Sequence, residues 1–342
     1  MKKKELLIEI TNKCPFNCIF CSSESNIHKN KFIEKKDFLK IINDAKKIGI
    51  DIIQLSGGEP FVHPNIIDFI DYVLDHEFLL EIYTCGCLYK NRQYLPIPEK
   101  ILTRYRNHPN LTIRFNFQTI NRENFAKLTR TTYGFKNSIS SIKTCIDLDI
   151  NTEVHIVPNC LNIRYLEETV EYLIDKLKIK HIKILRLILH GRALKNYQKL
   201  VFSIRDLAII LNSLKDRHPS SRVEIGSAFS TLSNSCFRCE AGINKFMITS
   251  KLRLFPCTAF KNISYCFIKL SEINSLRKVI SNKTLNIKLQ NFKENLKCAY
   301  CLERKFCSEI CPIQKLVCTN IKQIDLTEEF KKVKVSLENI IM

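Results

Sequence analysis

Clustered cysteines are the feature that most constrains this chain of 342 residues. Most of its 16 cysteines fall in three groups: Cys14, Cys18 and Cys21; Cys236, Cys239 and Cys257; and Cys298, Cys301, Cys307, Cys311 and Cys318. Thiols grouped at short spacings in an intracellular chain indicate metal binding or catalysis more often than disulfides. We therefore expect metal centres rather than a disulfide framework.

Composition and charge restrict the class of protein further. Hydrophobic residues make up 45% and charged residues 26%, so the chain can bury a core and is not disordered by composition. No apolar run approaches membrane-spanning length, and the basic start MKKKELLIEI lacks the features of a signal peptide. We therefore expect a cytoplasmic protein without a membrane partner. The net charge of +20 permits an anionic partner, but the basic residues are scattered, which favours compositional drift.

Short apolar runs alternate with amphipathic segments from Leu6 to about Leu189. We predict strands at Leu6–Ile10, Ile52–Leu55, Leu79–Tyr83, Leu111–Phe117, Thr152–Val157 and His181–Leu187. We predict helices at Asp37–Ile48, Asn65–His76, Pro98–Asn107, Phe135–Leu148 and Tyr165–Leu177. Repeated strand–helix units imply parallel strands with crossover helices, and six units are too few for a closed eight-unit barrel. The expected fold is α/β, a partial (β/α)6 TIM-like barrel.

The pattern changes after residue 195. A helix at Ser203–Lys215 and a strand at Arg222–Ile225 are expected in a bridging segment, residues 196–235. From Cys236 onward the periodicity weakens and cysteines accumulate, as where metal sites replace a hydrophobic core. We therefore divide the chain into a core at 1–195, the bridging segment, and a cysteine-rich domain at 236–342.

The first motif is TNKCPFNCIFC, from Thr11 to Cys21, directly after the first predicted strand. Its three thiolates can hold three irons of a 4Fe–4S cube and leave the fourth iron open for a ligand. A zinc knuckle completed by His28 is the alternative, but Phe20 and the position at the end of a strand favour the cluster. This segment resembles the radical S-adenosylmethionine (SAM) enzymes, in which the open iron chelates the amino and carboxylate groups of SAM.

The second motif, Ser56-Gly57-Gly58-Glu59-Pro60, follows the second predicted strand. It resembles the GGE motif of the same enzymes. There the glycines let the backbone approach the ligand closely, and backbone oxygens with the acidic side chain receive the SAM ammonium group. The resemblance therefore assigns Gly57, Gly58, Glu59 and Pro60 to cofactor binding.

Two further segments resemble SAM-binding parts of these enzymes. In NFQTINRENFAKLTRTTYGF, Asn116 stands at a position that is usually Ser, and Arg130 lies near a position that is usually Arg. An amide can bond the SAM ribose or carboxylate, and a guanidinium can pair with the carboxylate. In ILRLILHGRA, we weigh Arg186, Leu187 and Arg192 as lining of the SAM pocket against a buried strand followed by a surface arginine.

The cysteines of the last third resemble the SPASM domain, an extension that carries two auxiliary 4Fe–4S clusters. By position, the resemblance assigns Cys236, Cys239, Cys257 and Cys311 to the first auxiliary cluster, and Cys298, Cys301, Cys307 and Cys318 to the second. A zinc ribbon that uses four of these cysteines is the alternative. The family usually has a glycine shortly before the Cys257 position, where this chain has Lys251 and Arg253.

Five cysteines lie outside these groups. Cys145 and Cys266 are expected to be small core residues. Cys85 and Cys87 follow the third predicted strand, and Cys160 follows the fifth, at the end of a barrel where active sites lie. We interpret these three as candidate catalytic thiols, which could donate a hydrogen atom or act as an acid or base. A structural role is the alternative.

The resemblance implies an enzyme that reductively cleaves SAM to a 5′-deoxyadenosyl radical, which abstracts hydrogen from a peptide or protein. Maturation of a ribosomally made peptide, by crosslinking or epimerisation, is the leading interpretation. A sulfatase-type formylglycine maturase is an alternative, although Thr258 stands where that group commonly has an Asp base. RNA modification is the alternative of another class, although we expect no nucleic-acid partner.

The expected partners follow from the same resemblance. They are a substrate with an acidic leader, a separate leader-binding protein, because little chain precedes Leu6, and an electron donor such as flavodoxin or ferredoxin.

Overall fold

The computed structural model describes residues 2–188, 190–202, 204–226, 239–261, 267–270 and 276–281, together with residues 285, 287 and 289. Several cysteines with predicted roles lie outside these residues: Cys266, predicted to be a core residue, and the predicted auxiliary-cluster ligands Cys236, Cys298, Cys301, Cys307, Cys311 and Cys318. Among the residues described, no helix combines the length and the apolar character that crossing a membrane requires.

A ten-stranded sheet forms the centre of the molecule, in the order β12-β11-β10-β1-β2-β3-β6-β7-β8-β9. The six predicted strands are confirmed as β1 (Glu5–Thr11), β2 (Ile52–Gly57), β3 (Leu79–Thr84), β6 (Leu111–Asn116), β7 (Asn151–Ile156) and β8 (His181–Ile184). All six run parallel to their neighbours. The sheet is open, because β12 and β9 stand at its two ends.

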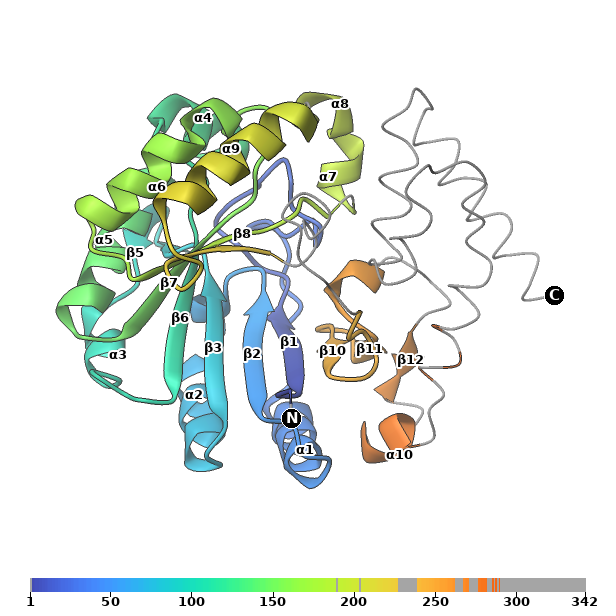
Figure 1. Ribbon diagram of the computed structural model, residues 1–342. Helices are drawn as coiled ribbons and strands as arrows, with labels where there is room; N and C mark the ends of the chain where they lie inside the picture. The colour runs from blue at the N-terminus through green and yellow to red at the C-terminus, as the bar shows by residue number, and fades with distance from the viewer. Residues whose placement is uncertain are drawn as a thin grey trace.

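The five predicted crossover helices are confirmed as α1 (Lys35–Lys47), α2 (Ile66–Asp75), α3 (Glu99–Thr103), α5 (Gly134–Asp147) and α6 (Leu166–Asp175). They follow the strands around the outside of the curved sheet (Figure 1). The bridging helix and strand are also present, as α9 (Ile204–Arg217) and β9 (Val223–Ile225).

The sheet extends beyond the six units on both sides. At one side β9 pairs parallel with β8. At the other, β10 (Lys245–Ile248) pairs parallel with β1, and β11 (Arg253–Phe255) and β12 (Ile268–Lys269) continue it antiparallel. The sequence pattern weakens from Cys236 onward and predicted no strand there, so β10, β11 and β12 are strands that the sequence analysis missed.

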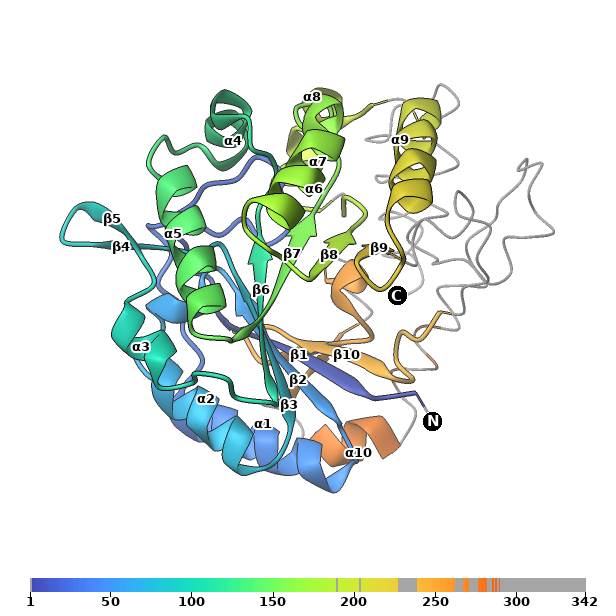
Figure 2. The ribbon, with the colours of Figure 1, turned by 60° about the vertical axis from the view of Figure 1, so that its left-hand side comes forward.

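Several short elements were not predicted. A hairpin of β4 (Cys87–Lys90) and β5 (Gln93–Pro96) projects beyond α5 (Figure 2). Its turn residues Asn91 and Arg92 both have positive φ, the geometry usually marked by Asn-Gly, so the sequence signal is weak. Four short helices were also not predicted: α4 (Arg122–Thr129), α7 (Arg192–Lys195), α8 (Tyr197–Leu200) and α10 (Leu276–Ser281).

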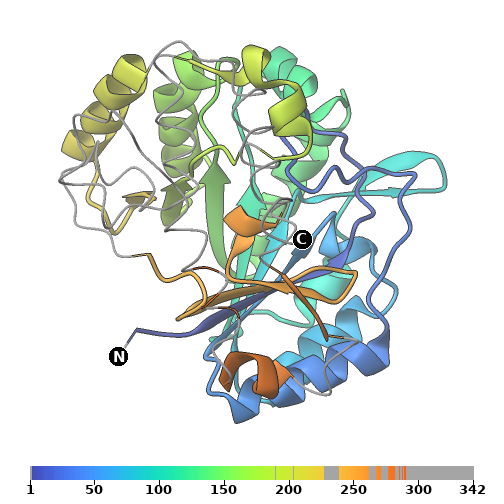
Figure 3. The ribbon, with the colours of Figure 1, turned by 90° about the vertical axis from the view of Figure 1, so that its right-hand side faces the viewer.

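Helix α10 lies beside α1, although more than two hundred residues separate them in the chain (Figure 3). The Leu276 amide donates to Asp44 Oδ2 at 2.8 Å. The described C-terminal residues are thus attached to the barrel by a buried hydrogen bond.

The two faces of the sheet differ in chemistry. In β1, the alternate residues Leu6, Ile8 and Ile10 are fully buried in the main hydrophobic core, which the helices complete. Glu5 and Glu9 occupy the other face of the same strand. Because side chains alternate along a strand, the helices cover the apolar face of β1, and the inner face carries Glu5 and Glu9 beside Leu7, which packs in a second apolar cluster. That inner face and the strand ends provide the candidate site.

Candidate cluster and cofactor site

The loop that carries Cys14, Cys18 and Cys21 begins where β1 ends. The Cys14 amide donates to Asn26 O at 3.1 Å, which closes the loop back on its own start. The amides of Asn17 and Ile19 donate to Thr129 O and Leu128 O at 3.1 and 2.9 Å, at the end of α4. Backbone hydrogen bonds therefore fix the loop on both sides of Cys18.

The pKa values of Cys18 and Cys21 depend on burial and on neighbouring charges. Burial raises the pKa of Cys18 well above its usual range, and the charges of Cys14 and Cys21 raise it further. Burial also raises the pKa of Cys21, which the Arg192 guanidinium lowers and Cys14 raises. Thiols with raised pKa values bind metal only by releasing their protons, so a bound iron would stabilise thiolates that burial disfavours.

Three thiols on one loop are a donor set that an iron–sulfur cube can use. In the described part of the chain, no three His, Cys, Asp or Glu side chains converge as the ligands of one metal ion would. In a cube each thiolate binds its own iron, so neighbouring but separate thiols on one loop suit it.

The GGEP turn is built directly against the cysteine loop. A Cβ on Gly57 would lie 2.1 Å from Thr11 O, and a Cβ on Gly58 would lie 2.0 Å from Lys13 O. The amides of Gly58 and Glu59 donate to these same two oxygens, each at 2.8 Å. Only glycine allows such a close approach of two backbones. The GGEP turn therefore packs directly against the backbone at Thr11 and Lys13, which leads into Cys14.

Glu59 is fully buried, and its carboxylate is engaged inside the protein. It accepts hydrogen bonds from the amide of Phe61 at 3.1 Å and from the Thr84 hydroxyl and the Cys85 amide at 2.7 Å each. Burial raises its pKa, against the effect of these donors. Glu59 therefore ties the turn after β2 to the loop after β3, while Pro60 opens a short 3-10 helix at Pro60–Val62.

Two of the three candidate catalytic thiols lie at this junction. Burial and a hydrogen bond with Cys14 raise the pKa of Cys85 well above its usual range. Burial, then the charge of Glu59, raises the pKa of Cys87 to about 12. Cys160 instead lies exposed after β7. Cys145 is fully buried, as predicted for a core residue.

Asn116 and Arg130 come from different elements. Asn116 is exposed at the end of β6, where its Oδ1 accepts from Gln118 Nε2. Arg130 is an exposed residue with φ of 56°, which ends α4. Gln118 was missed by the sequence analysis; it is buried, and its Oε1 accepts from the Val157 amide at 2.8 Å, so it joins the ends of β6 and β7.

A charged network on the inner face of the sheet was also missed. Arg114 donates to Glu81, to Glu153 at 2.7 Å and to the Tyr83 hydroxyl at 2.8 Å. His155 lies in the same network, with its ring 5.5 Å from that of Tyr83 and its Nε2 3.5 Å from Glu153 Oε2. Alternation of polar residues along the strands was the signal that could have located this network.

Arg192 is not a surface arginine. It is 9% exposed, and its Nε and Nη2 donate to Cys18 O at 2.6 Å and Ser25 O at 2.7 Å. Its own amide donates to Cys21 O at 3.0 Å. The segment after β8 therefore contacts the cysteine loop directly.

Two predicted auxiliary-cluster ligands are described, Cys239 and Cys257. Both pack against one apolar cluster that includes Met247, Phe255 and Phe260. The turn between β10 and β11 contains Leu252 at φ 56°, a left-handed conformation that favours glycine. The glycine expected before Cys257 is thus replaced by a leucine that adopts a glycine-like conformation.

This segment also reaches the cysteine loop. Lys261 Nζ contacts the Glu9 carboxylate and the Ser23 hydroxyl, and Ser23 Oγ donates to Glu9 at 2.8 Å. The three side chains join the inner face of β1, the cysteine loop and the segment that follows Cys257.

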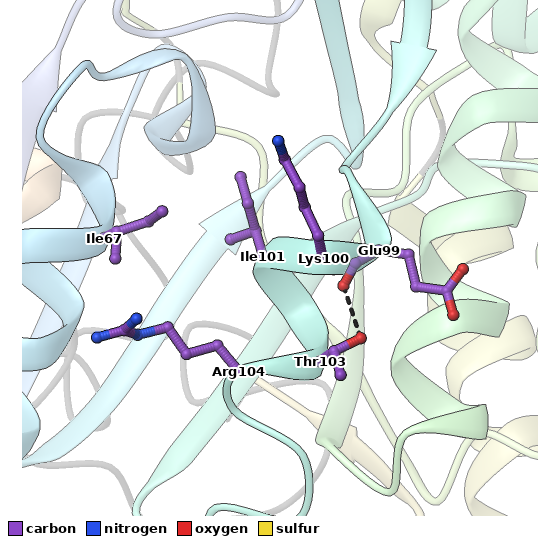
Figure 4. A pocket seen from close by; sticks show the side chains of 6 residues that line it. All are labelled: Ile67, Glu99, Lys100, Ile101, Thr103 and Arg104. Atoms are coloured by element: carbon purple, nitrogen blue, oxygen red, sulfur yellow. Dashed lines mark hydrogen bonds between the residues drawn. The ribbon is translucent and has the colours of Figure 1, made fainter.

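A separate surface hollow lies between α2 and α3, lined by Ile67, Glu99, Lys100, Ile101, Thr103 and Arg104 (Figure 4). None of these residues belongs to the cysteine loop or the GGEP turn. The charged side chains point in different directions, so the hollow presents no converging ligand set.

Comparison with known sequences gives a consistent picture. The sequence model of the radical SAM superfamily matches residues 8–173. A probable GTP 3′,8-cyclase of Methanocaldococcus jannaschii is 27% identical over 176 residues, 50% of this chain and 55% of that protein. The PqqA peptide cyclase of Bradyrhizobium diazoefficiens is 20% identical over 203 residues, 59% of this chain and 51% of that protein. The chain thus spans about half the length of the curated relatives it matches.

Solved structures share the fold. Streptococcus suis SuiB bound to S-adenosylmethionine superposes with a TM-score of 0.69 at 19% identity, over 92% of this chain and 74% of SuiB. The anSMEcpe protein with bound AdoMet gives a TM-score of 0.64 at 14% identity, over 98% and 99% of the two chains. The largely parallel sheet is therefore that of the radical SAM barrels. Residues 8–173 match the model of the radical SAM superfamily, and this part of the chain is therefore a radical SAM domain.

Proposed function

We propose that this protein is a radical SAM enzyme that abstracts hydrogen from a peptide or protein substrate. A 4Fe–4S cluster held by Cys14, Cys18 and Cys21 would supply the electron that cleaves SAM to the 5′-deoxyadenosyl radical. The observation that carries the proposal is the contact of Gly57 and Gly58 with the backbone just before Cys14. It puts the proposed SAM-binding turn beside the proposed cluster ligands.

The chain's own residues supply position and shielding. Glu59 holds the proposed SAM-binding turn in place. Its carboxylate accepts hydrogen bonds from the Phe61 amide, the Thr84 hydroxyl and the Cys85 amide. Asn116, exposed at the end of β6, is available to bond the SAM ribose or carboxylate. Because Cys14 is only 8% exposed, the start of the cysteine loop is shielded from water.

A peptide or protein substrate is supported by the relatives. One sequence relative is a PqqA peptide cyclase, and one SuiB structure contains the precursor peptide SuiA. The positive net charge suits an acidic leader segment. Peptide maturation by crosslinking or epimerisation is the specific form of the proposal. A formylglycine maturase is the alternative, but Thr258 offers no carboxylate base.

Two auxiliary clusters belong to the same proposal. Cys239 and Cys257 pack against one apolar cluster, which brings two proposed ligands of the first auxiliary site to one region. The auxiliary clusters would accept the electron from the substrate radical or relay electrons. The remaining proposed ligands, Cys236, Cys298, Cys301, Cys307, Cys311 and Cys318, lie outside the described residues.

A nucleotide substrate is the second candidate, favoured by the 27% identity to a probable GTP 3′,8-cyclase. That relative shares the radical SAM region, and the chemistry of a substrate pocket varies more than the fold that supports it. The two candidates separate by product. Incubation with GTP should leave the nucleotide unchanged if the substrate is a peptide, and a cyclised nucleotide would overturn the peptide proposal.

Anaerobic reconstitution with iron and sulfide tests the enzyme itself. With dithionite and SAM, the wild-type chain should form 5′-deoxyadenosine, and the Cys14→Ala, Cys18→Ala and Cys21→Ala variants should not. Cys145→Ala is the matched control, because it removes a buried core thiol elsewhere and should retain cleavage. Roughly twelve irons per chain would support three clusters, and roughly four would remove the auxiliary clusters from the proposal. Bound zinc without SAM cleavage would overturn it.

A further inference from the structure

The cysteine loop is held by a distant segment that the proposed function does not yet use. We call Gly191–Asn196, which follows β8, the clamp segment. Its central residue, Arg192, donates from Nε to Cys18 O, from Nη2 to Ser25 O and from its amide to Cys21 O, at 2.6, 2.7 and 3.0 Å. One residue therefore bonds the peptide groups of two proposed cluster ligands.

The rest of the clamp segment fits the loop closely. Gly191 has a φ of 56°, and a Cβ there would lie 2.6 Å from Ser22 O and 3.0 Å from Cys21 O. Asn196 Nδ2 donates to Ile19 O at 3.1 Å, and Lys195 Nζ pairs with Glu24 at 2.6 Å. Contacts to residues on both sides of Cys21 show a built surface rather than a chance approach of one side chain.

The positive charge of Arg192 is buried close to the backbone of Cys18 and Cys21. The side chain is almost completely buried, so its field is screened less than that of a surface cation. Lys195 on the same helix turn is the opposite case, because its side chain is 70% exposed and its charge is paired with Glu24. The two residues thus offer a buried cation and an exposed cation on one short segment.

We propose that Arg192 is a positioning residue for the cluster, which holds Cys18 and Cys21 in place and raises the reduction potential of the cluster. This inference rests on the proposed 4Fe–4S site. A cluster gains a negative charge when it accepts an electron, and a nearby buried guanidinium favours the more negative form. Hydrogen bonds and charges around a cluster are known determinants of its potential.

Full-length wild type and the variants Arg192→Gln, Arg192→Lys and Lys195→Gln test it after anaerobic reconstitution. The readouts are iron content and the midpoint potential of the SAM-responsive cluster, followed by electron paramagnetic resonance during a redox titration. A chain with Cys14, Cys18 and Cys21 all changed to Ala gives the signal of any other cluster, which is subtracted. These readouts do not depend on turnover.

Arg192→Gln should lower the midpoint potential and the iron content. Arg192→Lys keeps the charge but cannot bond two carbonyl groups with one planar fork, so it should lose iron while its potential stays near that of wild type. Lys195→Gln should match wild type in both readouts. Because Lys keeps the charge, the iron content and midpoint potential of Arg192→Lys can be measured even where Arg192→Gln does not fold.

An unchanged potential and iron content in Arg192→Gln would overturn the inference, and so would equal effects of Arg192→Gln and Lys195→Gln. Where Arg192→Gln does not fold, a wild-type iron content in Arg192→Lys would overturn it. These results leave the proposed function standing. A wild-type chain that takes up no iron would instead overturn the proposed function and this inference with it.

Discussion

Gly58 lies so close to Lys13 that a Cβ on this glycine would be 2.0 Å from the Lys13 carbonyl oxygen. Gly58→Ala must therefore push the GGEP turn away from the cysteine loop, at a cost of about 1–3 kcal/mol in the free energy of unfolding. If the turn binds SAM, 5′-deoxyadenosine formation should fall by at least about tenfold, the effect of about 1.4 kcal/mol on a barrier.

Gly49→Ala is the control for this change. Gly49 has a positive φ of 69°, but nothing lies within 4 Å of its added Cβ. It should lose about 1 kcal/mol of stability through backbone strain and keep SAM cleavage. Equal cleavage by the two variants would show that close contact between turn and loop is not required.

The Arg114 network gives a prediction on stability. Arg114 and its partners Glu81 and Glu153 are only 12–16% exposed, so Arg114→Met would leave two carboxylates in a poorly solvated site. We expect a loss of about 3–5 kcal/mol in the free energy of unfolding, measured by urea denaturation of the apoprotein. Arg104→Met removes an arginine that is 57% exposed and paired with Asp71, and should cost less than about 1 kcal/mol. Similar losses in both variants would contradict this prediction.

His155 predicts a pH dependence of stability. Burial lowers its pKa from 6.5 to about 4, and the charge of Arg114 adds to the effect against the opposing Glu153 carboxylate. Between these two pH values the unfolded chain binds a proton that the folded chain does not. The free energy of unfolding therefore has its full value above pH 6.5. It falls as the pH decreases towards 4, by about 3 kcal/mol in total.

The matched measurement compares wild type with His155→Gln, which cannot titrate. Urea unfolding at pH 7 and at pH 5 should show wild type losing more stability between the two than the variant does. Parallel losses in the two proteins would mean that His155 titrates in the folded state as it does in the unfolded chain.

The strands of the barrel were predictable because their signals are local. Leu6, Ile8 and Ile10 form an apolar alternation, and the crossover helices have amphipathic periods. Strand β10 was missed because its pairing with β1 joins Glu5 to Lys245, residues that are far apart in the chain. No local pattern records such a contact.

The candidate site also combines residues that the sequence predicted with contacts that it did not. The cysteine loop and the GGEP turn are short motifs, so their residues were found from the sequence. The contact of Arg192 with Cys18 spans 174 residues, and it depends on a guanidinium that bonds backbone oxygens, which any residue type supplies. The sequence therefore located Arg192 near the site without its partner. The same holds for His155, whose burial against Tyr83 follows from packing.

The pair formed by Lys261 and Glu9 should couple the segment after Cys257 to the barrel. Their side chains are 14% and 9% exposed. Lys261→Met would leave the Glu9 carboxylate buried with only the Ser23 hydroxyl of this group, whereas Glu9→Gln together with Lys261→Met removes both charges. A double-mutant cycle on the free energy of unfolding should therefore give a coupling of about 1–3 kcal/mol. The exposed pair Lys195 and Glu24 provides the comparison and should give less than about 1 kcal/mol. If the two cycles agree, the Lys261 contact contributes no more than a surface ion pair, and the attachment of this segment to the cysteine loop must come from its apolar packing instead.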